Sequence, residues 1–187
     1  MIRLASNSST RAMLLREAGI EFVQESYDFN EDEIIAKTPK EFVYLATLGK
    51  YETNLRAFGC EDLALLVADT VVTAQGKILR KAKDEVEARD ILLSQSGSLT
   101  SIITCMIYQS KAKKIIDISQ TTYSFREFDR QDLEDYLKSG EWVGKAGACM
   151  VEGFCKNYIE EVRGFESTAM GLNIEVLKAF YEKLNPL

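Results

Sequence analysis

The sequence predicts an α/β protein with a mixed sheet. Over residues 2–94, segments with strand-like and helix-like patterns alternate, which favours parallel strands joined by helices. The apolar run Leu63–Ala68 is short and carries no charge, as is typical of a strand buried on both faces. Two β-rich segments, 99–108 and 114–128, flank a basic turn and predict an antiparallel hairpin. Parallel and antiparallel strands together make the sheet mixed.

The composition narrows the class of protein. The chain has 187 residues, of which 46% are hydrophobic and 28% charged, which is ordinary usage for one globular domain. The net charge of −6 argues against a nucleic acid polymer as partner, although a local basic cleft can still bind a nucleotide. No apolar run approaches the roughly 20 residues that span a bilayer, and the first residues lack a signal peptide's apolar region. We therefore expect a cytoplasmic protein with no membrane partner.

The chain contains no histidine, and this restricts its chemistry. Ser-His-Asp triads and His-ligated metals are excluded, so a general base must be Asp, Glu, Lys, Tyr or Cys. Any bound metal must be a hard cation held by oxygen atoms. The four cysteines, Cys60, Cys105, Cys149 and Cys155, form no CxxC pair, and we predict that they are free thiols packed in the core.

The first elements predict an anion site. Residues 2–5 form a strand, Ser6–Arg11 a loop rich in hydroxyl groups, and Ala12–Ala18 a helix that ends at Gly19. The helix N-terminus directs backbone N–H groups and a positive dipole end towards the loop. Arg11 in the first helical turn is unfavourable unless an anion is present, which supports phosphate binding. The alternative interpretation is an ordinary Ser/Thr cap with an exposed arginine.

A second strand and a long helix follow. Residues 21–26 form the strand, and the acidic segment 27–33 either coordinates a metal or is a solvated turn. Thr38 and Pro39 open a helix that runs to Phe58 and contains Lys50.

The stretch 63–93 is the part around which the rest is organised. Asp69 interrupts its apolar run, and an isolated buried charge is costly, so this carboxylate must be paired, metal-bound or at the mouth of a cleft. After a turn at Gln75-Gly76, the basic cluster 80–83 precedes a helix capped by Asp84. An acid at a strand end followed by cations favours a metal ion and an anionic substrate. Alternatively, Asp69 caps a turn and the lysines are solvated.

The remaining elements are predicted from shorter patterns. Residues 129–137 form a helix, and glycines then interrupt the chain. Short strands are expected at 148–154 and 156–162, followed by a terminal helix over 170–184.

Four segments resemble motifs of the Maf family of nucleoside triphosphate pyrophosphatases. The opening LASNSSTRAMLL is similar to L-A-S-x-S-P-R-R-x-x-L-L, and VADTVVTAQGKILRKAKDEVEARDIL is similar to A-D-T-x-V…G-x-x-L-x-K-P-x-D-x-x-E-A-x-x-M-L. The third, SGSLTSIITCMIY, resembles S-G-x-x-H-x-V-x-T-x-V. The last, KAGACMVEGFCKNYIEEVRGFESTAMGLNIEVL, resembles D-K-A-G-x-Y-x-I-Q-G…I-x-G-x-x-x-x-V-x-G-L-P. The resemblance covers essentially the whole chain.

The resemblance implies a Maf/ITPase-like fold, in which residues 1–187 form one domain of two lobes around a central cleft. It implies hydrolysis of a (d)NTP to (d)NMP and pyrophosphate with a divalent metal, Mg²⁺ or Mn²⁺. Family members have been linked to septum formation and cell-division arrest, and clearance of non-standard nucleotides fits the same chemistry. A homodimer is compatible with the family.

Carried over by position, the phosphate loop corresponds to Ser6, Ser8 and Arg11. Lys50 matches the lysine of the long helix, and Lys81 matches the lysine of the G-K-P motif.

The resemblance also assigns the acids. Asp69 matches the family's proton acceptor, and it either takes the proton of the attacking water or holds the metal. Glu31 matches the acidic metal ligand before the long helix, with Glu33 as its competitor.

Three positions separate substrate classes in the family, and here they are Thr10, Thr70 and Glu152. Thr70 resembles the branch that prefers dTTP and UTP, whereas Glu152 resembles the branch that prefers 7-methyl-GTP. Thr10 replaces an arginine, and Gly144 replaces the Asp of D-K-A-G. Base preference therefore stays open.

Two rival hypotheses remain. One is a house-cleaning hydrolase of the inosine triphosphatase type, with different base recognition. The other is a catalytically weak nucleotide-sensing protein in division control.

Overall fold

The computed structural model describes residues 1–151 and 153–184, with side chains described as far as Tyr181. Within them the chain forms two compact units. The first comprises Met1–Thr70, Ile103–Gln120 and Phe165–Leu187, and the second comprises Val71–Ile102 and Thr121–Gly164.

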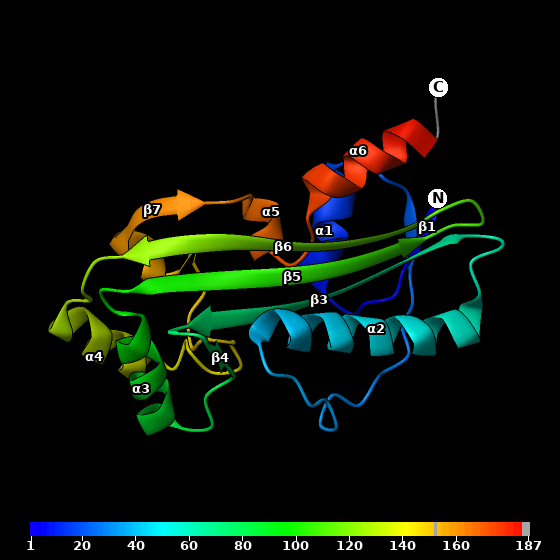
Figure 1. The fold of residues 1–187 in the computed structure, drawn as a ribbon. Coiled ribbons are helices and arrows are strands. Elements are labelled where there is room, and N and C mark those ends of the chain that lie inside the picture. The colour runs from blue at the N-terminus through cyan, green and yellow to red at the C-terminus, as the bar shows by residue number, and fades with distance from the viewer. Residues whose placement is uncertain (152, 185–187) are drawn as a thin grey trace. The chain divides into compact units, whose positions relative to one another are not determined.

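The elements of the first unit come from both ends of the chain (Figure 1). They are β1 (Ile2–Leu4), α1 (Ser9–Glu17), β2 (Phe22–Gln24), α2 (Pro39–Phe58), α5 (Glu166–Ala169) and α6 (Ile174–Leu184). Three long strands contribute residues to both units: β3 (Ala64–Ala74), β5 (Leu99–Gln109) and β6 (Lys114–Phe125). The second unit adds β4 (Lys77–Leu79), α3 (Glu85–Gln95), α4 (Arg130–Ser139), the 3₁₀ helix η1 (Phe154–Tyr158) and β7 (Ile159–Arg163).

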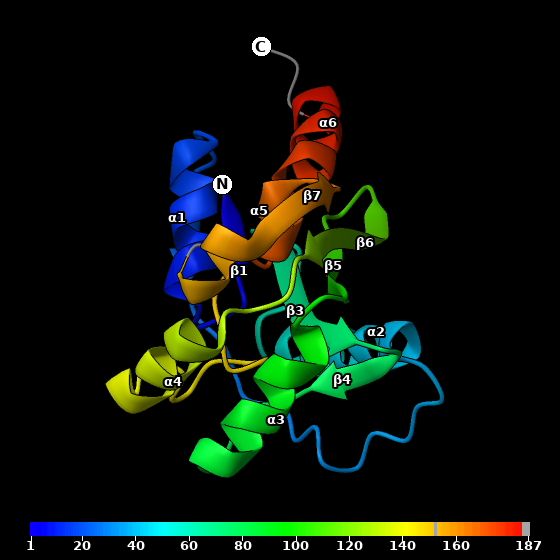
Figure 2. The ribbon, with the colours of Figure 1, turned by 90° about the vertical axis from the view of Figure 1, so that its left-hand side faces the viewer.

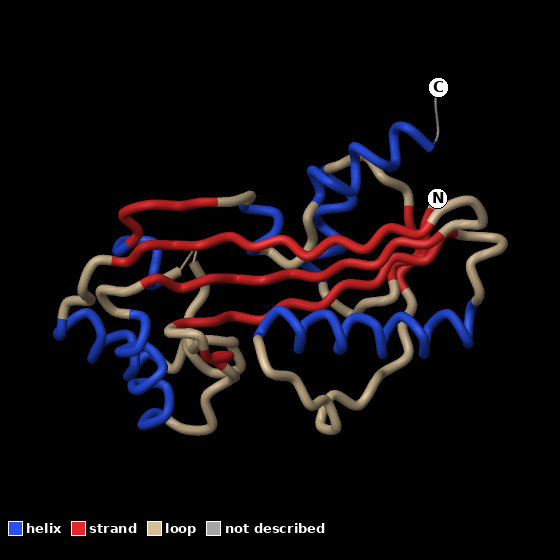
Figure 3. The backbone as a smooth tube through the Cα atoms, in the orientation of Figure 1, coloured by secondary structure: helices blue, strands red, loops and turns tan. Residues whose placement is uncertain are grey.

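The described part of the chain contains one seven-stranded mixed sheet, drawn in red in Figure 3, which confirms the predicted fold class. Its strand order is β2-β1-β3-β5-β6-β7, with β4 pairing with β3. β1 is parallel to both β2 and β3, whereas β4 is antiparallel to β3 and β7 to β6. None of the helices built from described residues is long and apolar enough to cross a membrane.

In the first unit, the side chains of β3 alternate between two hydrophobic cores because successive residues of a strand point to opposite faces. Leu66 and Ala68 pack with residues of α1 and α6, whereas Leu65 and Val67 pack with Tyr51 of α2. Figures 1 and 2 accordingly show α2 on one side of β3, and α1 with α6 on the other. The alternation predicts that residue 69 faces α2 and residue 70 faces α1.

Two predicted helix boundaries of the first unit are confirmed. Thr38 caps α2, since its hydroxyl accepts a hydrogen bond from the backbone N–H of Glu41, and the helix ends before Gly59. The predicted terminal helix over 170–184 starts too early, because Gly171 has φ +103° and interrupts the chain between α5 and α6.

The prediction that β3 ends at Asp69 is wrong. The strand runs on to Ala74, since β-branched residues at 70–73 favour extended structure. Asp69 therefore lies inside a strand, and it is 9% exposed.

The second unit carries an aromatic cluster and two further corrections. Phe128 and Phe154 lie with their ring centroids 5.2 Å apart, and Tyr158 contacts both rings. The strand predicted over 148–154 is absent from the described residues of that range, because Gly147 and Ala148 both have positive φ. The other predicted strand starts at Ile159 rather than 156.

The cysteines divide into two classes. Cys149 and Cys155 form a disulfide, with Cα atoms 6.5 Å apart across a tight loop, so the prediction of free thiols is wrong for this pair. It is confirmed for Cys60 and Cys105, which are free and buried. Burial raises the pKa of the Cys105 thiol to about 11.

Candidate functional site

A cavity of about 260 Å³ lies in the first unit, beyond the point where β1 ends. β1 pairs with β3 only as far as Leu66, and β4 pairs with β3 only from Val72, so residues 67–71 of β3 have no partner in either strand. Side chains from both faces of β3 can therefore converge beside Ala68. Ligands of α/β sheets commonly bind at the carboxyl ends of strands, where such a crevice forms.

The start of α1 offers backbone donors next to Arg11, the residue of this helix that lines the cavity. α1 begins at Ser9, earlier than predicted, because the Ser8 hydroxyl caps it by accepting from the Arg11 backbone N–H. The Ser8 backbone N–H in turn donates to Ser6 Oγ. The backbone N–H groups of Ser9 and Thr10 have no acceptor in the described part of the chain, which is the usual condition of an anion-binding helix terminus.

The Arg11 guanidinium is held by neutral oxygen atoms. Its Nε donates to the Gly171 carbonyl at 2.7 Å, Nη1 to Ser6 Oγ at 3.0 Å, and Nη2 to Thr70 Oγ1 at 3.1 Å. The described residues place no carboxylate within ion-pair distance of it. A guanidinium carries five N–H groups, so two stay available in a side chain that lines the cavity.

Burial lowers the pKa of Arg11 from its ordinary value, although the more distant charges of Asp69 and Glu31 act in the opposite direction. An arginine remains charged even so. A partly buried cation without a paired acid is costly, and an anionic ligand would remove that cost.

Lys50 has the opposite surroundings. Its ammonium lies 2.7 Å from Asp69 Oδ1 and 2.5 Å from Glu31 Oε1. Burial lowers the pKa of Lys50, but the charges and hydrogen bonds of Asp69 and Glu31 outweigh it, so that the pKa is raised overall. Lys50 is therefore protonated at neutral pH and holds the two acids together.

The segment that carries Glu31 is fixed to α2 by two residues that sequence reasoning missed. Asn54 is buried, and its amide side chain bonds both the N–H and the carbonyl of Tyr27. The ring of Phe29 lies directly on Gly49, where an added Cβ would come within 2.2 Å of the ring. The detectable signal was an asparagine inside a helix, four residues after Lys50 and hence on the same face.

The two acids fit a hard divalent cation. Asp69 and Glu31 converge on one point, where the Lys50 ammonium bridges them. No group of three or more metal-binding side chains occurs among the described residues, so this pair supplies two carboxylate ligands. Mg²⁺ is usually bound by one or two carboxylates together with water and substrate phosphate oxygens, which matches this donor set. Glu33, the competitor of Glu31, is exposed and does not line the cavity.

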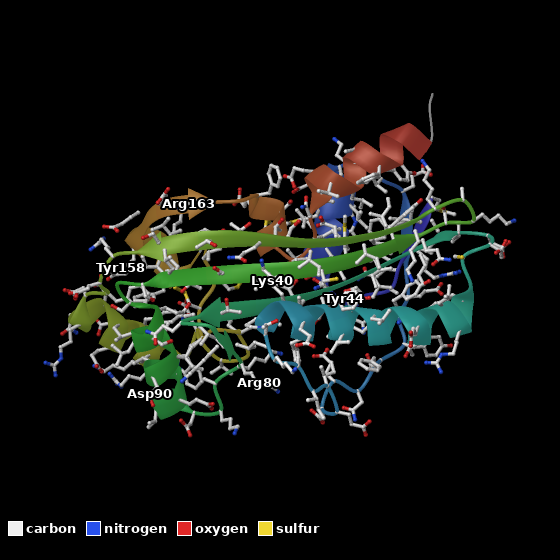
Figure 4. All side chains as sticks on the ribbon, in the orientation of Figure 1. Lys40, Tyr44, Arg80, Asp90, Tyr158 and Arg163 are labelled. Carbon is white, nitrogen blue, oxygen red and sulfur yellow. A yellow bond between two sulfur atoms is a disulfide. The ribbon has the colours of Figure 1, made fainter. Side chains whose placement is uncertain are left out.

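The other predicted site residues belong to the second unit, do not line the cavity, or lie outside the described residues. Lys81 belongs to the second unit, where it forms a bridge with Ala146 after Arg80, which Figure 4 labels. Its contact with phosphate stays a prediction. Thr10 lies in the first turn of α1 but does not line the cavity. Glu152 lies outside the described residues.

Comparison with known proteins agrees with these observations. The sequence profile described as "Maf-like protein" matches residues 1–184. The chain is similar to a protein of a Nitratiruptor species named nucleoside triphosphate pyrophosphatase, with 57% identity over 95% of this chain and 96% of the relative.

Proteins with the same name from Campylobacter jejuni and Helicobacter pylori are 39% and 40% identical. The first match covers 96% of this chain and 100% of the relative, and the second covers 93% and 91%. The family profile spans nearly every residue, and the alignments cover 91–100% of each relative, so the chain belongs to the Maf family.

Proposed function

We propose that this protein is a nucleoside triphosphate pyrophosphatase that hydrolyses a (d)NTP to the monophosphate and pyrophosphate. The observation that carries the proposal is the juxtaposition of two cations in one cavity. Arg11 has no paired carboxylate among the described residues and can bind a phosphate. Lys50, in contrast, forms ion pairs with Asp69 and Glu31. The names of the relatives agree with this chemistry.

In this proposal the phosphate chain is bound from the α1 side. Arg11 and the free backbone N–H groups at Ser9 and Thr10 supply charge-assisted hydrogen bonds to phosphate oxygens. Ser6 and Ser8 position these donors, since their hydroxyls accept from Arg11. Lys81 is proposed to contact the leaving pyrophosphate.

The acids act from the α2 side. Asp69 accepts the proton of the attacking water or serves as a metal ligand, and with no histidine in the chain a carboxylate is the suitable base. Asp69 and Glu31 would hold Mg²⁺ or Mn²⁺, which when bound supplies positive charge that neutralises the phosphate oxygens. Lys50 holds the two carboxylates close to each other and stabilises developing negative charge.

The test is pyrophosphate release from a panel of dTTP, UTP, CTP, ITP and 7-methyl-GTP, with Mg²⁺ or Mn²⁺. We expect turnover of one or two nucleotides, abolished by EDTA and by Asp69→Asn. Preference for dTTP or UTP would connect specificity with Thr70, and preference for 7-methyl-GTP with Glu152. Nucleotide binding without any turnover would sink the enzyme assignment and favour the sensing hypothesis. Dominant ITP hydrolysis would favour the inosine triphosphatase type.

The predictions of a cytoplasmic location, a homodimer and a role in cell division stay predictions.

A further inference from the structure

Thr104 lies on β5 behind the cavity. It is 1% exposed, does not line the cavity, and shares its strand face with Met106 and Tyr108, which pack against α1 and α6. It is also the second threonine of the SGSLTSIIT segment, to which the family resemblance assigned no role. Its hydroxyl is nevertheless connected to the cavity through other polar groups.

The directions of these hydrogen bonds are fixed by counting hydrogens. Thr104 Oγ1 lies 2.7 Å from the Thr168 carbonyl, which can only accept, so Thr104 must donate its single hydroxyl hydrogen there. Thr70 Oγ1 lies 2.9 Å from Thr104 Oγ1, and because that hydrogen is used, Thr70 must be the donor. Thr70 therefore presents a lone pair, and not its hydrogen, to Arg11 Nη2 at 3.1 Å.

A second set of hydrogen bonds connects Arg11 to the Thr168 carbonyl, so that the two sets together form a closed ring. Arg11 Nε donates to the Gly171 carbonyl, and the Gly171 N–H donates to the same Thr168 carbonyl at 3.1 Å. A Cβ at Gly171 would lie 3.3 Å from Thr70 Oγ1 and 3.4 Å from Arg11 Nε, so the ring is also tightly packed. The guanidinium is thus held from two sides by groups that converge on one carbonyl oxygen.

We propose that Thr104 is a positioning residue for phosphate binding. By accepting from Thr70, it turns the Thr70 hydroxyl so that its lone pair faces Arg11, and this fixes the guanidinium with two N–H groups left for the ligand. Without Thr104 the Thr70 hydrogen loses its acceptor and can turn towards Arg11, where donor would face donor. The inference rests on the proposed function for the identity of the ligand, a triphosphate.

The experiment compares Thr104→Val, which keeps the shape, with Thr104→Ser, which keeps the hydroxyl. Two quantities are measured: KM and kcat for the nucleotide turned over, and the Kd of inorganic pyrophosphate by calorimetry. For Thr104→Val we expect both KM and Kd to rise by roughly 3- to 10-fold, as for loss of one hydrogen bond, with kcat near the wild-type value. Thr104→Ser keeps the hydroxyl group and should bind pyrophosphate with wild-type affinity.

Two further variants separate positioning from stability. Thr73→Val is the matched control, since Thr73 lies on β3, is 6% exposed, and donates to the Ser101 carbonyl at 3.1 Å. It should lower the melting temperature without changing Kd. Thr70→Val, at a more exposed position, should reproduce the loss of pyrophosphate affinity. Thr104→Val added to Arg11→Lys should weaken pyrophosphate binding no further, because the two changes act on one interaction.

Unchanged pyrophosphate affinity in Thr104→Val would overturn the inference while leaving the proposed function intact. So would equal losses in the Val and Ser variants, or full additivity with Arg11→Lys. If the wild-type protein hydrolyses no nucleotide, the proposed function fails, but the pyrophosphate titration still decides the role of Thr104. Wild-type protein that binds no pyrophosphate overturns the inference, whereas nucleotide turnover decides the proposed function separately.

Discussion

The two sides of the cavity hold their cations in opposite ways. On the α1 side, Arg11 is bound by hydroxyl and carbonyl oxygens, and no described carboxylate pairs with it. On the α2 side, Lys50 is bound by two carboxylates. The difference arises at neighbouring residues of one strand, since Thr70 and Asp69 point to opposite faces of β3. Arg11 is therefore available to bind an anion, whereas Lys50 holds Asp69 and Glu31 together.

The largest effect should come from the acid side. Asp69→Asn removes the proposed base and leaves the Thr70–Arg11 bond in place, so we expect kcat to fall by about 10²- to 10⁴-fold with pyrophosphate affinity little changed. Steady-state kinetics and calorimetry measure the two quantities. Asp62→Asn, an exposed carboxylate just before the same strand, is the control and should behave as wild type. Equal activity of Asp69→Asn and wild type would remove Asp69 from the mechanism.

The second-largest effect on activity should come from Arg11, on the α1 side of the cavity. Arg11→Lys keeps the charge but loses the planar fork that bonds three acceptors, so kcat/KM should fall by roughly 10- to 100-fold. Arg16→Lys on the last turn of the same helix is exposed, and the same assay should find it unchanged. If Arg11→Lys binds pyrophosphate like wild type, the guanidinium is structural only.

Lys50→Met tests whether the lysine holds the acids together. At pH 8 the two carboxylates would face each other without a cation, and we expect the melting temperature to fall by roughly 2–8 °C. The raised pKa of Lys50 has the matching sign: its stabilisation is complete below the ordinary lysine pKa and is lost only as pH rises through the higher folded value.

A divalent cation should reduce the deficit of Lys50→Met. Added Mg²⁺ should raise the melting temperature of the variant more than that of wild type, since the cation replaces the ammonium between the acids. Lys40→Met, at the exposed start of α2 (Figure 4), is the control. A deficit of the same size with and without Mg²⁺ contradicts the ion-pair interpretation.

The smallest effect concerns the support of Glu31. In Gly49→Ala the new methyl group would displace the Phe29 ring, so thermal unfolding should show a loss of about 1–3 kcal/mol and kcat should fall modestly. In a Phe29→Ala background the ring is gone, and the same change should stabilise by about 0.5–1 kcal/mol, as alanine does inside a helix. The same sign in both backgrounds would show that the ring does not rest on Gly49.

Local signals account for what the sequence predicted well. Helix α2 has its cap at Thr38 and its stop at Gly59, and both signals lie within the chain segment itself. The start of α1 was predicted three residues too late, but the contacts of the loop before it are also local, since its serines cap the helix and hold Arg11 within five residues. Such features need no distant partner.

The errors occurred where distant residues decide the conformation. β-branched residues extend the strand past Asp69, but the buried charge of Asp69 is tolerated there because Lys50, from another element, neutralises it. Gly171 interrupts the last helix, and its packing partners Thr70 and Arg11 lie far away in sequence. The positioning role of Thr104 likewise depends on Thr70, Thr168 and Arg11, which lie in three separate segments. No local pattern encodes these contacts.

The bond from Arg11 to Gly171 joins residues 160 positions apart. During synthesis the first strand, loop and helix leave the ribosome long before Gly171 does, and the guanidinium then lacks one of its three acceptors. The phosphate side of the site can therefore be completed only when nearly the whole chain has been translated. A fragment that stops before α5 would carry every acid and base discussed in the first unit, yet its arginine would be held by two acceptors instead of three. The phosphate-binding side of the site thus depends on a residue that is synthesised 160 positions after Arg11.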